Sequence, residues 1–237
     1  MSEKSYEQDR IETGRGEVAI TFLGHGTLQF SFQNKTVHVD PIDRVADYRD
    51  MPAADIIFIT HHHRDHLDPG SVRHILKGGT EIVLTAMCAD QLRRELKREL
   101  EEKSVRLHVM KNGDTLEVQG LAVSAVPAYN RVHMREENVP FHIKGEGNGY
   151  LMRFGEKRVY VAGDTENIPE MEKLPDIAVA FLPVNLPYTM TPGMAVEAAR
   201  VIRPDILYPY HFGDTDTERL VELLRDTGID VRIRSMA

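Results

Sequence analysis

The chain alternates between short apolar runs that are typical of strands and longer segments with helical spacing. The continuous apolar run 55–60 predicts a buried strand, and leucines that recur at every fourth position predict a helix over 89–102. The second half repeats this order, with strands first and predicted helices at 192–202 and 217–225. Two successive halves, each of strands followed by helices, predict two sheets packed together with the helices outside.

The predicted strands are short and bounded by turn residues. They are 18–23, 28–32, 36–39, 55–60, 81–85, 107–110, 115–118, 121–126, 150–154, 158–162, 177–182, 206–208 and 231–233. A short helix is expected to begin at Asp68. Residues 130–149 have no clear periodicity, and a loop of that length is usually functional or disordered. No change of composition separates the halves, so we expect a single domain over residues 1–237.

Composition and charge narrow the classes of function. The 237 residues include 29 basic and 37 acidic side chains, and the formal net charge of −8 lacks the basic surface expected of a nucleic-acid-binding protein. The single cysteine, Cys88, excludes an internal disulfide and a thiolate metal cluster, and it suits a reducing compartment. The polar N-terminal segment and the short apolar runs predict a cytoplasmic protein without membrane insertion.

Histidines are the compositional excess, with eleven in the chain and four of them within residues 61–66. His61 and His63 stand two apart at the end of an extended segment, so their side chains project to the same side. Asp65 and His66 can turn back toward the same point as the chain enters a helix. Four nitrogen and oxygen ligands from one loop predict a metal centre.

Residues 61–66 match the signature His-x-His-x-Asp-His of the metallo-β-lactamase-fold superfamily, which the chain resembles over most of its length. An aspartate after an upstream strand, an aspartate in a Gly-Asp-Thr turn and a histidine after a late strand complete the pattern as Asp40, Asp164 and His211. The resemblance implies an α+β fold, a four-layer αββα sandwich of two mixed β-sheets flanked by helices.

Three further segments are similar to one branch of that superfamily, the branch with ascorbate-6-phosphate lactonases and N-acyl phosphatidylethanolamine phospholipase D. They are residues 21–26, 163–165 and 182–184. The superfamily resemblance also implies a dinuclear ligand set. One metal is expected on His61 and His63, a second on Asp65, His66 and His211, and Asp164 is expected to bridge them.

One position departs from the superfamily pattern. Relatives place a third histidine for the first metal after the strand near 126–128, where this chain has Asn130. An asparagine oxygen can bind a hard cation but is a weaker partner for zinc than imidazole is. His133 and His142 are the alternatives, and we favour His142 because its apolar neighbours would make an unpaired imidazole costly there.

The implied centre predicts hydrolysis by a metal-bridging hydroxide. Two divalent ions are expected, with Zn²⁺ favoured and Mn²⁺ or Fe²⁺ as alternatives. Asp65 is expected to orient the attacking water and accept its proton, and Asp40 to support the ligands around it. Asp65 and Asp40 are therefore the candidate catalytic residues.

Substrate contacts are expected from two segments. The candidate substrate-binding residues are Asn130, Asn185 and Tyr188. Residues 183–192 lie between a predicted strand and a helix N-terminus, where backbone amides and hydroxyls can bind an anionic group. Arg131, Arg135 and Lys144 in the long loop either bind such a group or form a solvated lid.

The resulting expectation is a hydrolase of a small ester, lactone or phosphodiester, and the substrate can be neutral or anionic. The alternatives are a nuclease or phosphodiesterase acting on nucleic acid, which the net charge opposes, and a diiron redox protein of the same fold. Diiron relatives typically carry glutamate in place of the second motif histidine, which is His63 here. No nucleic-acid partner is expected, and the sequence leaves a homo-oligomer open. His25 is either a rim residue of the site or a structural histidine.

Overall fold

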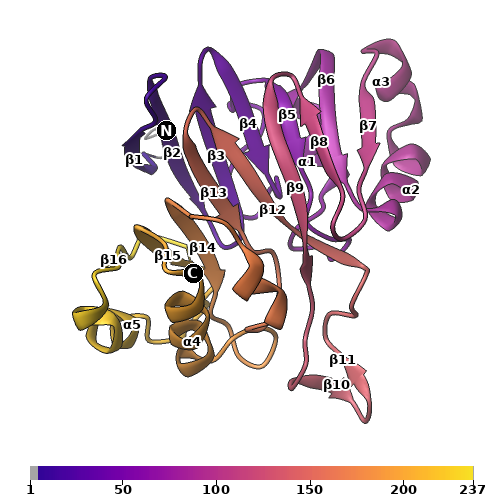
Figure 1. Cartoon of the computed structure of the whole chain (residues 1–237). Helices are drawn as coiled ribbons and strands as arrows, with labels where there is room; N and C mark the ends of the chain where they lie inside the picture. The colour runs from indigo at the N-terminus through magenta and orange to yellow at the C-terminus, as the bar shows by residue number, and fades with distance from the viewer. Residues whose placement is uncertain (1–4, 237) are drawn as a thin grey trace.

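Two seven-stranded sheets carry helices on their outer faces in the computed structural model, which describes residues 5–236 (Figure 1). The first sheet runs in chain order, antiparallel from β1 to β4 and parallel from β4 to β7. Its strands are β1 (Glu7–Glu12), β2 (Glu17–Gly24), β3 (Thr27–Phe32), β4 (Lys35–Val39), β5 (Ala54–Phe58), β6 (Leu76–Leu84) and β7 (Arg106–Val109).

The second sheet has the order β16-β15-β14-β13-β12-β9-β8, parallel from β16 to β13 and antiparallel from β13 to β8. Its strands are β8 (Thr115–Val118), β9 (Leu121–Ala128), β12 (Gly147–Phe154), β13 (Lys157–Val161), β14 (Val179–Pro183), β15 (Ile206–Tyr210) and β16 (Asp230–Val231). Both sheets are mixed, and together with the helices they confirm the predicted fold class.

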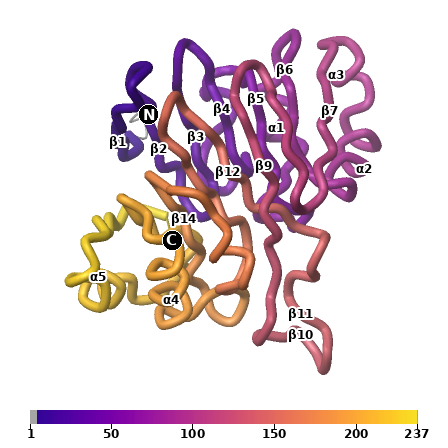
Figure 2. Tube along the Cα trace, in the orientation of Figure 1, coloured from indigo at the N-terminus to yellow at the C-terminus, as the bar shows by residue number. Residues whose placement is uncertain are grey.

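Helices cover the outer face of each sheet, as the trace in Figure 2 also shows. Those of the first half are α1 (Pro69–Ile75), α2 (Ala86–Glu95) and α3 (Lys97–Glu102). Those of the second half are η1 (Pro169–Lys173), α4 (Pro192–Ile202), α5 (Glu218–Leu224) and η2 (Arg225–Thr227). Apolar side chains fill a layer between the sheets and one under each helical layer. Burial of these three layers stabilises the four-layer sandwich.

An aromatic layer joins the two sheets at their facing surfaces. Phe22 of β2 and Phe181 of β14 both contact the ring of Tyr208 on β15, with centroid separations of 4.9 and 5.1 Å. All three side chains are at most 2% exposed. Because large rings bury more apolar area than other side chains, this layer fixes how the first sheet sits on the second.

The ends of parallel strands bring the chemically active residues to one edge of the sandwich. Asp40 follows β4, and the motif beginning at Thr60 follows its parallel neighbour β5. Asp164, Asn185 and His211 follow β13, β14 and β15, which are also parallel neighbours. Ligand sites of mixed and parallel sheets form outside these carboxyl ends, so the topology itself assembles the site.

Two elements differ from the sequence prediction. Strand β1 was not predicted, because its sequence is mostly charged and Ile11 is its only buried side chain. The predicted helix over 89–102 is two helices, α2 and α3, which are interrupted at the buried Leu96. The break keeps the leucines of both helices against the first sheet.

The predicted loop 130–149 contains a small hairpin, β10 (Met134–Glu136) and β11 (Val139–Pro140), which projects from the body of the molecule (Figures 1 and 2). Asp68 caps the start of α1 as expected, accepting hydrogen bonds from the backbone N–H groups of Gly70 and Ser71. Within residues 5–236, no helix combines the length and apolar character needed to cross a membrane.

Candidate metal centre and active site

The loop after β5 folds back on itself and gathers its ligands. The backbone N–H groups of His66 and Leu67 both donate to the carbonyl oxygen of His63, at 3.0 and 2.9 Å. This turn brings Asp65 and His66 back toward the end of the strand, where His61 is buried. The side chains of the motif therefore converge without any helix to support them.

A first cluster consists of three histidines. One ring nitrogen from each of His61, His63 and His142 lies within 4.8 Å of the other two. His61 and His63 come from the motif loop, whereas His142 arrives from the segment that follows the β10–β11 hairpin. His133, the alternative third histidine, lies with Nδ1 2.8 Å from the carboxylate of Glu166 and belongs to no such cluster among the described residues.

Asn130 holds His142 in place and does not face the substrate. Its side-chain oxygen accepts from the backbone N–H of His142 at 2.9 Å and pairs with His142 Nδ1 at 2.7 Å. Its amide nitrogen donates to Glu166 at 3.1 Å and to the carbonyl oxygen of Tyr188 at 2.9 Å. Asn130 is 5% exposed, and the cavity over the site does not include it. The expectation that Asn130 binds substrate is therefore corrected, because its amide is already occupied.

Glu166 is the anchor under Asn130, and the sequence reasoning missed it. Its carboxylate accepts hydrogen bonds at 2.7 Å from the backbone N–H groups of Arg131, Val132 and His133. Burial alone would raise the pKa of Glu166, but these donors and Asn130 outweigh it and lower the pKa. A glutamate one residue beyond the Gly-Asp-Thr turn gives no local signal of such a role.

A second cluster lies beside the first. Ligand atoms of His25, Asp65, His66 and His211 all lie within 4.8 Å of one another. His25 Nε2 is 3.2 Å from Asp65, and its ring centroid is 3.7 Å from that of His211. The sequence left open whether His25 is a rim residue of the site or a structural histidine, and in the structure it lies in the second cluster and lines the cavity.

Asp164 lies between the two clusters. Its carboxylate oxygens are 3.3 Å from His142 Nε2, 3.4 Å from His66 Nε2 and 3.5 Å from His211 Nε2. A third group of ligand atoms joins it to His61 and His66. One carboxylate that faces ring nitrogens of both clusters is the geometry expected of a bridging ligand.

Asp40 acts on His66 and does not reach the cavity. Its carboxylate is 2.7 Å from His66 Nδ1 and accepts from the backbone N–H and the hydroxyl of Thr60, at 2.8 and 2.6 Å. Its side chain is fully buried. We therefore correct the expectation that Asp40 is catalytic: it positions His66, and a carboxylate on Nδ1 leaves Nε2 to face Asp164.

Electrostatics keeps the carboxylates of Asp164 and Asp65 ionised. Burial alone would raise the pKa of Asp164, but His211, His66 and His142 around it lower the pKa well below its ordinary value. Burial would likewise raise the pKa of Asp65, but its hydrogen bonds with His211 and His25 outweigh burial and lower the pKa. Ionised aspartates are the form in which carboxylates bind metals.

Two histidines of the first cluster, His61 and His63, are held neutral. Burial, with the neighbouring ring of His142, lowers the pKa of His63 to about 4. Burial also lowers the pKa of His61 well below its usual value. Neutral imidazoles beside ionised carboxylates make a donor set that suits a borderline divalent cation.

Three buried atoms test whether a metal fits here. His66 Nε2, His211 Nε2 and Asp164 Oδ1 have no hydrogen-bond partner in the described part of the chain. Unpaired buried polar atoms are costly and rare in proteins, and these three point at one region. A bound cation would satisfy them, so the residues present fit the metal that the fold implies.

The backbone is strained at the same place. His25, Asp40 and His211 have φ values of 52°, 45° and 50°, in the left-handed region that non-glycine residues seldom adopt. Each follows the end of a strand, and the backbone N–H of His211 donates to the carbonyl of His25 at 3.0 Å. Such strain costs about 1–3 kcal/mol per residue and is typical of functional sites.

A cavity of about 520 Å³ opens over the two clusters. Its lining combines ligand residues, arginines and aromatic side chains: His25, Arg44, His63, Arg64, Asp65, Arg135, Phe141, His142, Asp164, Asn185, Tyr188 and His211. Asn185 and Tyr188, the other two candidate substrate-binding residues, therefore line the cavity over the clusters. Asn185 is also close to the second cluster, with its amide nitrogen 3.3 Å from His211 Nδ1.

Of the three basic residues expected near the substrate, one lines the cavity and two lie elsewhere. Arg135 lines the cavity. Arg131 donates to the carbonyl of Asn167 and lines a different cavity, and Lys144 pairs with Glu170 at 2.6 Å. The sequence reasoning missed Arg44 and Arg64, although Arg64 lies inside the metal motif, because only the folded chain shows which arginines face the site.

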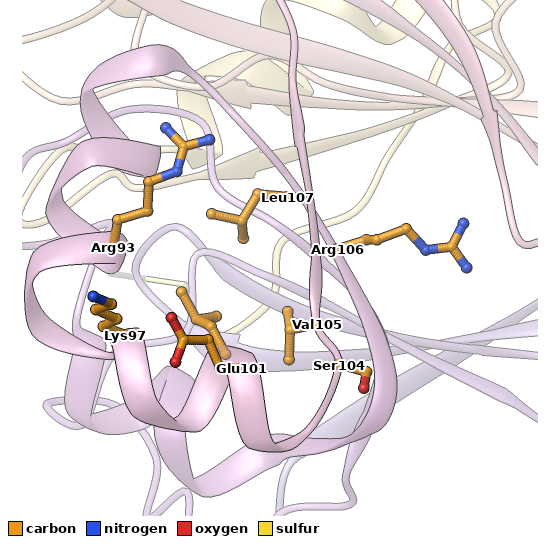
Figure 3. Close-up of a pocket in the computed structure, with 8 residues that line it drawn as sticks. Arg93, Lys97, Glu101, Ser104, Val105, Arg106 and Leu107 are labelled. Atoms are coloured by element: carbon orange, nitrogen blue, oxygen red, sulfur yellow. The ribbon is translucent and has the colours of Figure 1, made fainter.

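A second cavity, of about 610 Å³, lies between α2, α3 and β7 (Figure 3). Its polar lining includes Arg93, Lys97 and Glu101. It contains no histidine or aspartate, and we assign it no part in the chemistry.

A family model described as a beta-lactamase superfamily domain matches residues 19–211, and the chain belongs to this family. The structure of a provisionally assigned metal-dependent hydrolase from Parabacteroides distasonis is 44% identical, covers 98% of this chain and 100% of its own, and has a TM-score of 0.90. A UPF0173 metal-dependent hydrolase from Methanopyrus kandleri is 28% identical over 90% of this chain and 94% of the relative.

A more distant structure shares the fold alone. Igni18, a metallo hydrolase from Ignicoccus hospitalis, is 23% identical and has a TM-score of 0.68 over 91% of this chain and 94% of its own. The predicted enzyme class, a metal-dependent hydrolase, is confirmed by the relatives at 44% and 28% identity.

Proposed function

We propose that the chain is a dinuclear metal-dependent hydrolase of a small ester, lactone or phosphodiester. The observation that carries the proposal is the pair of histidine clusters with Asp164 between them and three unpaired buried ligand atoms at their meeting point. The cavity of about 520 Å³ has the size of a small-molecule site, which supports a small substrate. The choice of bond follows only the resemblance of three short segments, residues 21–26, 163–165 and 182–184, to lactonases and a phospholipase D.

Each residue has a defined task in this proposal. His61, His63 and His142 would hold one ion, and Asp65, His66 and His211 would hold the other, with Asp164 as the ligand shared between them. When bound, the two divalent ions would supply an activated water and polarise the scissile carbonyl or phosphoryl oxygen. Zn²⁺ suits this donor set best, with Mn²⁺ and Fe²⁺ as alternatives.

Asp65 is the proton acceptor in this proposal. Its carboxylate is half-buried, lines the cavity and is ionised, so it can receive a proton from the attacking water. Because an ionised carboxylate can only accept hydrogen bonds, the N–H of His25 donates to it and fixes its direction. His25 thereby positions the acceptor.

The test begins with metal content, measured by mass spectrometry on untagged protein. Wild type should hold about two ions per chain, and His61→Ala should hold fewer. His62→Ala is the matched control, because His62 lies between two proposed ligands but belongs to no ligand cluster among residues 5–236. The same samples are then assayed on panels of esters, lactones and phosphodiesters.

Two results would contradict the proposal. Wild type with fewer than about one ion per chain, unchanged by His61→Ala, would overturn the ligand assignment. Full metal content without hydrolysis of any compound in the three panels would overturn the hydrolase assignment.

A further inference from the structure

Three arginines from separate segments face the cavity over the metal clusters. Arg44 lies in the loop after β4, Arg64 lies inside the motif loop, and Arg135 lies on β10 of the projecting hairpin. All three line the same cavity of about 520 Å³. The fold therefore brings three guanidinium groups from distant parts of the sequence to one opening.

None of these guanidinium groups is paired with a carboxylate of the described residues. Within residues 5–236, Arg44, Arg64 and Arg135 make no side-chain hydrogen bond and no ion pair, although Arg135 lies 6.0 Å from the ring centroid of Phe141. Arg131, on the same segment as Arg135, instead donates to the Asn167 carbonyl. Unpaired cations at one cavity are notable in a chain with net charge −8.

The acidic groups of the cavity do not offset these charges. Asp65 and Asp164 are its only carboxylates among the lining residues, and both face the histidine clusters. Two divalent cations there would outweigh two carboxylates, and the arginines add further positive charge. A cleft lined by one sign of charge attracts and concentrates the opposite ion.

We infer that Arg44, Arg64 and Arg135 form a subsite for an anionic group, a carboxylate or a phosphate, that the substrate carries beside the bond to be cleaved. The planar guanidinium group matches both anions with paired hydrogen bonds. This inference rests on the proposed hydrolase function for its catalytic consequence, but the anion subsite itself does not require catalysis.

Aromatic side chains form the remaining wall of the subsite. The rings of Phe141 and Tyr188 meet edge to face with centroids 5.1 Å apart, and both line the cavity. Tyr188 is 46% exposed, so its ring is available to a ligand. The cavity therefore suits a substrate that joins an anionic group to an apolar segment.

The first experiment compares two activated esters with metal-loaded enzyme. Mono-p-nitrophenyl glutarate carries a free carboxylate, and p-nitrophenyl butyrate is neutral. Each of Arg44→Gln, Arg64→Gln and Arg135→Gln should lower kcat/KM for the charged ester by about 10-fold and change it for the neutral ester by less than about 2-fold. Arg131→Gln, a matched change on the same segment, should alter neither.

Wild type should also prefer the charged ester. Equal rates on the two esters, or equal losses on both in the arginine variants, would overturn the inference while leaving the proposed hydrolase intact.

The second experiment measures binding without catalysis. Inorganic phosphate and glutarate are titrated separately into full-length, metal-depleted protein by calorimetry, and the tighter ligand identifies the preferred anion. The triple Gln variant should bind that anion at least about 10-fold more weakly than wild type, with Arg131→Gln unchanged. Unchanged affinity in the triple variant would overturn the inference. If no compound of the ester, lactone and phosphodiester panels is hydrolysed but anion binding depends on the arginines, the hydrolase proposal fails and the subsite stands.

Discussion

The side-chain oxygen of Asn130 accepts hydrogen bonds from both the backbone N–H and Nδ1 of His142, at 2.9 and 2.7 Å. The backbone N–H can only donate, so the atom it meets must be the amide oxygen rather than the nitrogen. His142 Nδ1 therefore carries a proton, and Nε2 is the ring nitrogen that faces Asp164, 3.3 Å away. A residue that departs from the expected histidine thus sets the tautomer of the histidine that replaces it.

Asn130→Ala should weaken metal binding without removing a ligand. His142 would lose both contacts that fix its ring, and loss of such a supporting contact typically costs 10–100-fold in metal affinity. Competition with a chromogenic chelator measures the change. Asn167→Ala is the matched control, because within residues 5–236 the side chain of Asn167 hydrogen-bonds only to the exposed Glu197. Equal affinities in Asn130→Ala and wild type would show that His142 needs no such support.

His142→Ala should reduce metal content from about two ions to about one, because the first cluster would retain only His61 and His63. His133→Ala, which removes the other histidine of the same segment, should retain both ions. Mass spectrometry of the two variants, prepared in parallel, decides between them. Two tightly bound ions in His142→Ala would refute the assignment of the third histidine.

Asp65→Asn should lower kcat by about 10²–10⁴-fold at saturating metal, because an amide cannot accept the proton of the attacking water. The rate is measured on whichever panel compound wild type hydrolyses, with metal content determined on the same sample. Asp90→Asn, an exposed aspartate on α2, should keep the wild-type rate. A fully loaded Asp65→Asn enzyme of normal rate would exclude Asp65 as the acceptor.

His38 should make the fold sensitive to acid. It is fully buried, and burial lowers its pKa to about 4, although the hydrogen bond to the carbonyl of Pro52 acts to raise the pKa. The unfolded chain takes up this proton near pH 6.5, so it binds more protons than the folded chain between these values, and stability falls as the pH falls through this range. The expected loss is about 2 kcal/mol between about pH 7.5 and pH 5.

Urea unfolding of metal-depleted protein at both pH values measures this effect. His38→Gln, which keeps a donor for Pro52 but cannot titrate, should lose about 2 kcal/mol less than wild type on acidification. His74→Gln removes an exposed histidine and should behave as wild type. An identical acid loss in His38→Gln and wild type would rule out this source of pH dependence.

Gly26→Ala should disturb the second cluster. A methyl group at Gly26 would lie 2.8 Å from Cε1 of His66 and 3.3 Å from its Nδ1, too close for the ring to remain beside Asp40. We expect at least about 10-fold weaker metal binding, by analogy with other losses of ligand support. Gly193→Ala in helix α4 is the control and should bind metal normally, because the nearest atom to its added methyl group would be Thr191 Oγ1, 3.7 Å away. Calorimetric metal titrations of the two variants provide the comparison.

The sequence predicted the elements whose own residues carry the signal. The buried strand β5 and helix α4 have continuous or periodic apolar faces, and both lie close to their predicted positions. Strand β1 lacks such a face. It is held instead by its pairing with β2 and by the ion pairs of Asp9 with Arg232 and Arg234, which exist only in the folded chain. Local patterns do not report contacts that span most of the chain.

The same distinction separates the parts of the site. The motif residues share one loop, so their spacing alone predicted that they converge. Glu166, Arg44 and Arg64 acquire their roles from segments that lie far away in the sequence. The sequence alone predicts Asn130 to be a substrate-binding residue. Its hydrogen bonds with His142 and Tyr188 form between segments that only the tertiary structure brings together.

Each proposed metal position draws ligands from both sheets of the sandwich. His61 and His66 follow the first sheet's β5, whereas His142 and His211 belong to the second half of the chain. An ion bound to such a set acts as a cross-link between the halves, so loading and sheet docking are thermodynamically linked. Folding of the loaded chain should therefore be more cooperative, and an aromatic residue between the sheets, such as Tyr208, can affect metal affinity without touching the metal.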